Sequence, residues 1–521
     1  MQINVQKYTG TKLNCAQQQQ LLSTSRNSTL LLLPSSLSLK LEVSYRKMLL
    51  SLGILSLFWS VCCTTFVSDN EELNRIFADM SPKVVNPLKE PIILSSEPVQ
   101  GLHLALKGHN EMIAIWLTPV PFINNSFTPA CLYGNIHSET PSKVQGKSYT
   151  YTAGMFQLTL NRAVLKLERF ENIYDIVYYV CGDPAYGWST IQSFSLQKPN
   201  MQTPKEVNSC TVSKSENSYI SSVNSKSEKR NLIGIVGDLG VTNSDETIES
   251  IWNFTRSLEM KILIHIGDIS YADNFSKREG NNSYIWTEYM NKIKRITSRI
   301  PYMVLPGNHE VQFNFGAYLN WFRMPYLESD SDSPFWYSFD YMGVHFSMFS
   351  TEHDVNQSSI QYQWLENDLN KANLNRDKVP WVIALAHRPL YCSSHNANIS
   401  CKSLSTKLRA ALENLLVQKN VDVYVSGHVH HYERSYPVAN NVVSSWNYHN
   451  PKAPVHLING AGGNPEPNDE SFYNKAKWRA FYVKGKDTGH VIMEVFPKAL
   501  HFQYIRSKDS AVVDEFRLTR T

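Results

Sequence analysis

The chain has 521 residues, of which 42% are hydrophobic and 12% aromatic, enough to bury a large core in more than one domain. Its formal net charge is +4, but residues 1–67 hold six basic residues and one acidic residue, so the remainder has 44 basic against 45 acidic residues and a net charge of −1. No basic run is interleaved with aromatic residues in the way a groove for single-stranded nucleic acid requires, which argues against a nucleic-acid partner.

The N-terminal segment has the pattern of a secretory signal that begins late. Arg46 and Lys47 precede the apolar stretch MLLSLGILSLFWSVCC, so we expect a signal peptide at about 46–67, initiation at Met48 and an upstream extension before it. A signal anchor is the alternative, although the run is short for a membrane span of about 20 residues. No later segment is long and apolar enough to cross a bilayer, so we expect no membrane contact after signal cleavage.

Residues 82–199 predict a small all-β domain. Short strand-like runs such as LHLALKG, MIAIWLT, KSYTYTAG and DIVYYVCGD follow one another with no helical pattern between them, as in an antiparallel sandwich. A polar stretch rich in Ser, Lys and Asn, residues 200–230, then predicts a linker. Chemistry is therefore expected in residues 231–521.

Strand and helix alternate in this last part. Apolar runs rich in β-branched residues predict buried strands that end at about 238, 268, 308, 387 and 428. Apolar residues at spacings of three and four predict helices between them, at Thr247–Leu258, Tyr284–Ile296, Ile360–Asn370 and Leu404–Val417. In such an arrangement functional side chains gather at the carboxyl ends of the strands.

Each of those strand ends carries a residue that can bind a metal. The motifs are GDLG, GDISY, GNHE, AHRP and GHVHH, and the candidate ligands are Asp238, Asp268, Tyr271, Asn308, His387, His428 and His430. Two cations about 3.5–4 Å apart can share a carboxylate and clamp a phosphoryl group, and carboxylate, amide, phenol and imidazole donors suit such a site. Four of the ligands directly follow a glycine, which we expect to adopt turn conformations closed to other residues.

The motif set resembles the metallophosphoesterase superfamily and, within it, the larger two-domain purple acid phosphatases. Most metallophosphoesterases begin with Asp-Xaa-His, whereas this chain has Gly240 at the third place, and the GDISY motif ends in Tyr271 where Asp is common. The resemblance implies a four-layer αββα sandwich with the metals at one sheet edge, preceded by a fibronectin type III-like domain at 82–199. The C-terminal part, 454–521, would then pack a second sheet against the first.

Carried over residue by residue, the resemblance implies a dinuclear centre of Fe(III) and a divalent Fe, Zn or Mn ion. Asp238, Tyr271 and His430 would bind the iron, with the phenolate of Tyr271 giving the visible colour of the family. The divalent ion would be held by Asn308, His387 and His428, and Asp268 would bridge both ions.

Two more histidines match positions that contact substrate in the family. His309 would contact the phosphate, together with Asn308, and protonate the leaving oxygen, and His395 in the loop YCSSHN would assist it. The implied reaction is the hydrolysis of a small phosphate monoester by a metal-bound hydroxide, with an acid optimum.

Taken one at a time, these residues have simpler explanations. A single Gly-Asp or Gly-Asn is common turn chemistry, and a single histidine after an apolar strand is usually a hydrogen-bonded core residue. We assign three other histidines to packing, because they lie within strand-like runs: His265, His345 and His456. It is the joint pattern that favours a metal site.

Cysteines and glycosylation signals agree with a secreted or lysosomal protein. We expect Cys392 to pair with Cys401 and Cys131 with Cys181, which leaves Cys210 for a free thiol or a partner chain, such as a homodimer. After the expected signal peptide, N-glycosylation sequons stand at six positions: Asn124, Asn253, Asn274, Asn281, Asn356 and Asn398.

Three functions remain open at this point. The first is an acid phosphatase that hydrolyses phosphate monoesters. The second is a phosphodiesterase or nucleotide pyrophosphatase on the same site, decided by loops around 314–335 and 392–401. The third is a metal-binding pseudoenzyme whose β domain docks a partner, which the retention of all seven ligand residues and His309 disfavours.

Overall fold

The computed structural model describes residues 97–521 except 109, 120–126, 139, 154–155, 171–175, 197–229, 276–281, 396 and 398. The expected extension, signal peptide and most of the linker lie outside the described residues, as do the sequons at Asn124, Asn281 and Asn398. None of the helices in the described ranges is long and apolar enough to cross a membrane.

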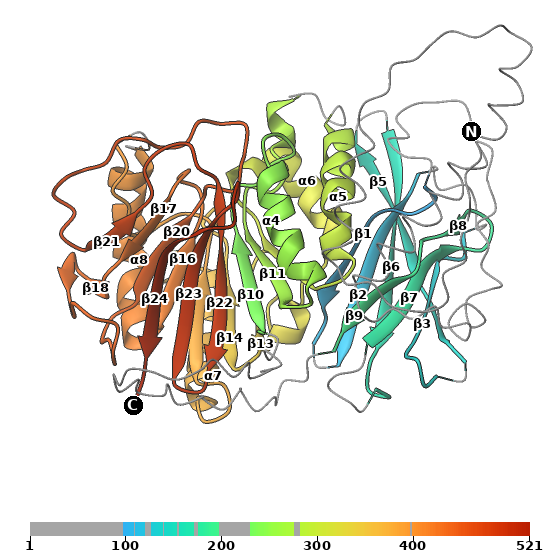
Figure 1. Cartoon of the computed structure of the whole chain (residues 1–521), viewed down its shortest axis with the longest axis horizontal. Coiled ribbons are helices and arrows are strands. Elements are labelled where there is room, and N and C mark those ends of the chain that lie inside the picture. Colours follow the sequence, from blue (N-terminus) through green and yellow to red (C-terminus); the bar gives the residue numbers. More distant parts are fainter. Residues whose placement is uncertain are drawn as a thin grey trace, which may run out of the picture. The chain divides into compact units, whose positions relative to one another are not determined.

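The first domain is all-β and consists of two antiparallel sheets (Figure 1). The first sheet has the strand order β1 (Gln100–Leu106), β2 (Glu111–Thr118), β6 (Phe156–Lys166) and β5 (Lys147–Ala153). The second has the order β4 (Ser142–Gln145), β3 (Ala130–Gly134), β7 (Ile176–Asp183) and β8 (Gly187–Trp188), with β9 (Gln192–Ser195) also paired to β7. The expected disulfide between Cys131 and Cys181 is present and joins β3 to β7.

Strand β2 shows how this domain attaches to the rest of the chain. Trp116 and its alternate neighbours face the core of the β domain, whereas Ile115 and its alternate neighbours join the core of the following domain. Polar contacts complete the attachment: Tyr179 donates a hydrogen bond to the carbonyl of Ser298 (2.7 Å) and the backbone N–H of Gly101 donates one to Asn291 Oδ1 (2.7 Å). The β domain is therefore packed directly onto the second domain.

The second domain contains two mixed sheets. The six-stranded sheet has the order β12 (Tyr302–Leu305), β11 (Met260–Ile266), β10 (Leu232–Val236), β22 (Gly489–Phe496), β23 (Ala499–Arg506) and β24 (Val512–Thr519). The seven-stranded sheet has the order β13 (Tyr337–Tyr341), β14 (Val344–Met348), β15 (Trp381–Leu385), β16 (Val423–Ser426), β20 (Val455–Asn459), β17 (Tyr432–Ser435) and β21 (Arg479–Tyr482). A small hairpin, β18 (Val438–Ala439) and β19 (Val442–Val443), stands apart.

Five α-helices are described, and all except α6 begin and end within about four residues of the expected positions. They are α4 (Asp245–Arg256), α5 (Ser283–Thr297), α6 (Gln312–Trp321), α7 (Ile360–Leu374) and α8 (Ser405–Gln418). Helix α7 begins at a Ser359 side chain that accepts a hydrogen bond from the backbone N–H of Tyr362, as an N-cap should. Helix α6, which the pattern did not single out, opens with left-handed backbone at residues 313–315.

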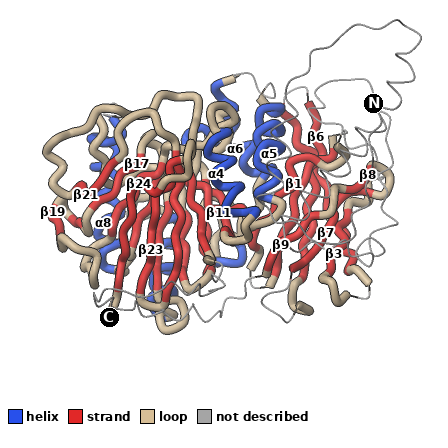
Figure 2. Tube along the Cα trace, in the orientation of Figure 1, coloured by secondary structure: helices blue, strands red, loops and turns tan. Residues whose placement is uncertain are grey.

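Alternation along β15 shows the layering. Ile383 belongs to the core shared with the six-stranded sheet, whereas Val382 and Ala384 belong to a second core with α7 and α8. On the other side, α4 and α5 contribute to the core around β10 and β11 (Figures 1 and 2). The domain is thus a helix–sheet–sheet–helix arrangement, as expected.

The C-terminal part differs from its expected role. Instead of forming one added sheet, it extends both: β20 and β21 join the seven-stranded sheet and β22, β23 and β24 join the six-stranded one. Strand β22 pairs antiparallel with β10, while β20 pairs parallel with β16. Each sheet therefore has a central strand whose end carries a candidate ligand, with the C-terminal strands beside it.

Candidate metal centre

The seven candidate ligands follow the ends of five strands in the two sheets. Asp238 follows β10, Asp268 and Tyr271 follow β11, and Asn308 follows β12, all in the six-stranded sheet. His387 follows β15, and His428 and His430 follow β16, in the seven-stranded sheet. The site therefore lies where the carboxyl ends of parallel strands from both sheets meet.

Four of the seven residues have left-handed backbone, which is unfavourable for residues other than glycine and tends to occur at functional sites. The φ angles are 56° for Asp238, 52° for Asp268, 56° for Tyr271 and 68° for His428. The turn after each strand is thus shaped to direct these side chains, at a cost of about 1–2 kcal/mol each.

The glycines before the ligands are needed chiefly for space, which corrects the expectation from sequence. Of the four, Gly267 alone has a positive φ, of 86°. A Cβ atom on Gly307 would collide with Asp268, and one on Gly427 would collide with Asp238. These glycines let the two carboxylates approach the neighbouring loops closely.

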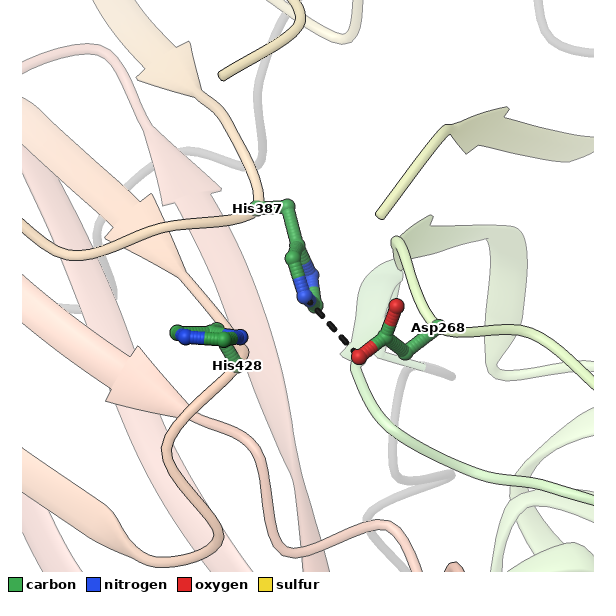
Figure 3. A group of neighbouring side chains, drawn as sticks. All are labelled: Asp268, His387 and His428. Atoms are coloured by element: carbon green, nitrogen blue, oxygen red, sulfur yellow. Dashed lines mark ion pairs between the residues drawn. The ribbon is translucent and has the colours of Figure 1, made fainter. Parts of the chain in front are cut away.

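The side chains form two neighbouring groups. In the first, Tyr271 Oη lies 3.2 Å from Asp238 Oδ1 and 3.2 Å from His430 Nε2. In the second, His387 Nε2 lies 3.0 Å from Asp268 Oδ2 and 3.2 Å from Asn308 Oδ1. His428 joins the second group, because Asp268, His387 and His428 each offer a ligand atom within 4.8 Å of the others (Figure 3). The structure thus brings all seven residues together.

In each of the three imidazoles, one ring nitrogen contacts a group outside the cluster, and the other ring nitrogen faces the cluster. His387 donates from Nδ1 to the carbonyl of Ile266 (2.9 Å), so Nε2 faces the carboxylate. His430 Nδ1 lies 3.4 Å from the carbonyl of Pro467. His428 is reversed: its Nε2 contacts Ser400 Oγ (2.7 Å) and Arg388 Nη1 (2.9 Å), which leaves Nδ1 for the cluster. Support of the second ring nitrogen is typical of metal-binding histidines.

Burial and the neighbouring charges shift the pKa values of the clustered side chains. Burial, and then the carboxylate of Asp238, raise the pKa of the Tyr271 phenol well above its usual value. Burial lowers the pKa of His387, but the charge of Asp268 outweighs it and raises that pKa to about 9. Burial raises the pKa of Asp238. A metal ion in place of the proton on His387 would satisfy the two oxygens that face it and favour the ionised phenol, so the donor set fits two cations.

His309 lies on the rim of this cluster. Its ring centroid is 4.0 Å from that of Tyr271, and its Nε2 points towards Asp268 Oδ2 at 3.8 Å. Its Nδ1 lies 2.8 Å from Asp273 Oδ1. Burial lowers the pKa of His309, but Asp268 and Asp273 outweigh that effect and raise the pKa to about 10.

His395 is not brought into the cluster. It is exposed, its backbone N–H donates to the carbonyl of Ser471 (2.7 Å), and its ring lies 3.6 Å from that of Tyr473. No contact among the described residues joins it to a candidate ligand. The second expected disulfide, between Cys392 and Cys401, does close the loop that carries it.

Several residues around the site were missed by the sequence reasoning. Glu310 accepts the backbone N–H groups of Gly307, Asp268 and Ile269 at 2.8–2.9 Å, and burial raises its pKa to about 7. Arg388 forms an ion pair with Glu352 (2.7 Å) beside His428. Glu310 and Arg388 stand inside the recognised motifs and could have been singled out; Glu352 and Glu466, which lies on the rim near His309 and His430, carry no local signal.

The three histidines assigned to packing are buried, and one of them, His265, lies close enough to the cluster for the charge of Asp268 to affect its pKa. His265 Nδ1 lies 2.6 Å from the Tyr302 hydroxyl and 3.2 Å from the Tyr289 hydroxyl. His345 bridges Asp340 (2.7 Å) and Asp368 (3.0 Å), and His456 packs between Tyr391 and Tyr424.

Comparison with known proteins identifies the family. Residues 232–432 match the calcineurin-like phosphoesterase model and residues 453–515 match the model for the C-terminal part of iron/zinc purple acid phosphatase-like proteins. Human acid phosphatase type 7 is 32% identical over 308 residues, covering 55% of this chain and 67% of that protein. The probable purple acid phosphatase 20 of Arabidopsis thaliana is 29% identical over 377 residues, covering 70% and 74%.

A solved structure agrees on the fold. Purple acid phosphatase PPD1 from seeds of yellow lupin (Lupinus luteus) superposes with a TM-score of 0.66 at 22% sequence identity, covering 82% of this chain and 75% of that one. Together with the sequence relatives, this places the chain in the purple acid phosphatase family, and as an enzyme it is an acid phosphatase.

Proposed function

We propose that this protein hydrolyses phosphate monoesters at a dinuclear centre of Fe(III) and a divalent Fe, Zn or Mn ion. Asp238, Tyr271 and His430 are the iron ligands, and Asn308, His387 and His428 hold the divalent ion. Asp268 would bind both ions. The observation that carries the proposal is the division of the seven side chains into two groups with Asp268 beside both: its carboxylate contacts His387 and its charge affects the pKa of Asp238 and His430.

The two cations would bind the phosphate and lower the pKa of a water molecule, supplying a nucleophile at acidic pH. The chain provides the rest. His309 Nε2 faces the cluster and donates a proton to the leaving oxygen, and Asp273 fixes its ring by accepting from Nδ1. Glu310 fixes the turns of Gly307 and Asp268 by accepting their backbone N–H groups.

The leaving group tests the role of His309. Replacing His309 with Ala should reduce kcat/KM for an alkyl phosphate by about 10²–10⁴-fold, and for 4-nitrophenyl phosphate much less, because a nitrophenolate leaves without protonation. His395→Ala is the matched variant, an exposed histidine with no contact to the cluster among the described residues. Equal losses for both esters in His309→Ala would contradict its role as proton donor, and a leaving-group dependence in His395→Ala would assign that role to His395.

A phosphodiesterase remains the second candidate, because the loop 392–401 reaches His428 through Ser400 and can shape the space beside the metals. Bis(4-nitrophenyl) phosphate distinguishes the two. Turnover of this diester at a higher kcat/KM than the monoester would overturn the monoesterase proposal.

We further propose that the β domain is fibronectin type III-like and that the protein is a secreted or lysosomal glycoprotein. Two disulfides, together with sequons at the exposed Asn274 and Asn356, support an oxidising compartment. A shift in mobility after removal of N-glycans from the cell-expressed protein tests this, and no shift would contradict it.

A further inference from the structure

Glu466 lies at the mouth of the metal centre on the loop that follows β20. Its backbone N–H donates to Asn464 Oδ1 (2.9 Å), and Asn464 in turn donates to the backbone carbonyl of Asp238 (3.2 Å). The backbone of the loop is therefore tied to a candidate iron ligand. The Glu466 side chain itself remains 42% exposed, so it can approach a bound ligand.

The carboxylate faces two imidazoles of the site. Glu466 Oε1 lies 3.6 Å from His309 Nε2, and Oε2 lies 3.9 Å from His430 Nε2. Both distances are too long for hydrogen bonds, so the carboxylate oxygens still have the capacity to accept hydrogen bonds from a ligand. The same two nitrogens face Tyr271 and Asp268, which places Glu466 over the iron half of the cluster.

A carboxylate is an unexpected group at this point. The substrate is a phosphate ester, and Asp238, Asp268 and Asp273 already contribute negative charge. Glu466 adds a charge that opposes the phosphate without forming a described side-chain hydrogen bond that the fold needs. Besides its ion pairs with His309 and His430, this charge can act on the part of the substrate that is not the phosphate.

The position of His309 indicates which part that is. If His309 Nε2 protonates the leaving oxygen, that oxygen lies about 3 Å from Nε2, and Glu466 Oε1 is 3.6 Å from the same nitrogen. Substituents one or two bonds beyond the leaving oxygen are then within reach of the Glu466 carboxylate. Their charge is felt there, because two charges about 6 Å apart interact appreciably near a protein surface.

We propose that Glu466 is a specificity residue that selects phosphate monoesters whose alcohol part carries an ammonium group and disfavours those whose alcohol part carries a carboxylate. This proposal rests on the proposed function, because it places the leaving oxygen by the role of His309. Since Glu466 is partly exposed, the effect is about tenfold in kcat/KM for each unit of charge.

Three esters of similar size test the proposal on the metal-loaded protein: O-phosphoethanolamine, ethyl phosphate and phosphoglycolate. Their kcat/KM values are measured for the native protein and for Glu466→Gln, with metal content determined in each. Comparing each ester between the two proteins cancels its intrinsic reactivity. We expect Glu466→Gln to lose about tenfold in preference for the ammonium ester and gain about tenfold for the carboxylate ester, relative to ethyl phosphate.

The matched control is Glu470→Gln, an exposed glutamate four residues along the same loop, which should keep the native preferences. Unchanged preferences in Glu466→Gln, with metal content intact, would overturn the proposal. A native protein that hydrolyses neither these esters nor 4-nitrophenyl phosphate would instead contradict the proposed function. In that case the binding of 2-aminoethylphosphonate and of propylphosphonate is measured by calorimetry in the native protein and in Glu466→Gln. If the ratio of the two dissociation constants is the same in both proteins, the proposed selectivity is overturned.

Discussion

The two sheets of the second domain bring different chemistry to the same site. The six-stranded sheet supplies oxygen donors, namely the carboxylates of Asp238 and Asp268, the phenol of Tyr271 and the amide of Asn308. The seven-stranded sheet supplies nitrogen donors, the imidazoles of three histidines: His387, His428 and His430. Neither set is complete without the other, since each proposed metal takes oxygen from one sheet and nitrogen from the other.

This division also pairs the buried charges of the site across the two sheets. The buried carboxylates of one sheet are compensated by the other: His387 pairs with Asp268 (3.0 Å), and the backbone N–H of His428 donates to Asp238 Oδ2 (2.9 Å). A buried charge needs such a partner. The metals would add bonds between residues of one sheet and residues of the other, so metal binding should stabilise the packing of the two sheets.

The largest effect is expected from replacing Asp268, the residue proposed to bind both metals between the two sheets. Asp268→Asn removes the carboxylate proposed to be shared by both metals, so kcat/KM should fall by on the order of 10³-fold or more, with loss of bound metal. Asp245→Asn, at a side chain that is 86% exposed at the start of α4, is the control and should match the native enzyme. Near-native activity in Asp268→Asn would show that the two sheets do not share a metal through this residue.

Removing the metals should lower the stability of the domain, because the metals are proposed to join its two sheets. A ligand present at 100 times its dissociation constant stabilises a protein by about 2.7 kcal/mol. We therefore expect a chelator to lower the midpoint of thermal unfolding clearly in the native protein and much less in Asp268→Asn, as measured by calorimetry. If the midpoint of thermal unfolding of the native protein were the same with and without chelator, metal binding between the two sheets would be contradicted.

A smaller effect should appear at a histidine of the seven-stranded sheet that lies outside the site. Burial lowers the pKa of His345, but its hydrogen bonds to Asp340 and Asp368 outweigh this and raise it to about 9; Asp368 also accepts from Ser338 and Ser347. A pKa raised above the unfolded value of about 6.5 gives stability that is complete below pH 6.5 and lost as the pH rises through 9.

His345→Gln should therefore cost about 2–3 kcal/mol of unfolding free energy at pH 6 and much less above pH 9.5, measured by urea denaturation. The exposed His449→Gln provides the comparison and should show no such dependence. Unlike metal removal, this loss should be the same with and without chelator. A loss that grows with pH would contradict the assigned charge state.

Sequence patterns predicted the position of the site, but they did not predict all the contacts that form it. The strands and candidate ligands could be placed because apolar runs and the residues that follow them are local features, and both disulfides were also expected. The distribution of β20–β24 between two sheets could not be predicted from the sequence, because strand pairing joins residues that are far apart in the chain. The same holds for Glu466, which reaches His309 across more than 150 residues of sequence.

The central claim is that Tyr271 from one sheet and His430 from the other bind the same iron, and one measurement tests it most directly. The visible absorption spectrum of the metal-loaded protein is recorded with its iron content, beside that of Tyr271→Phe. We predict a visible band that requires iron and disappears in Tyr271→Phe. A protein that binds iron without such a band, or a band that survives in Tyr271→Phe, would contradict the assignment of the phenol as an iron ligand.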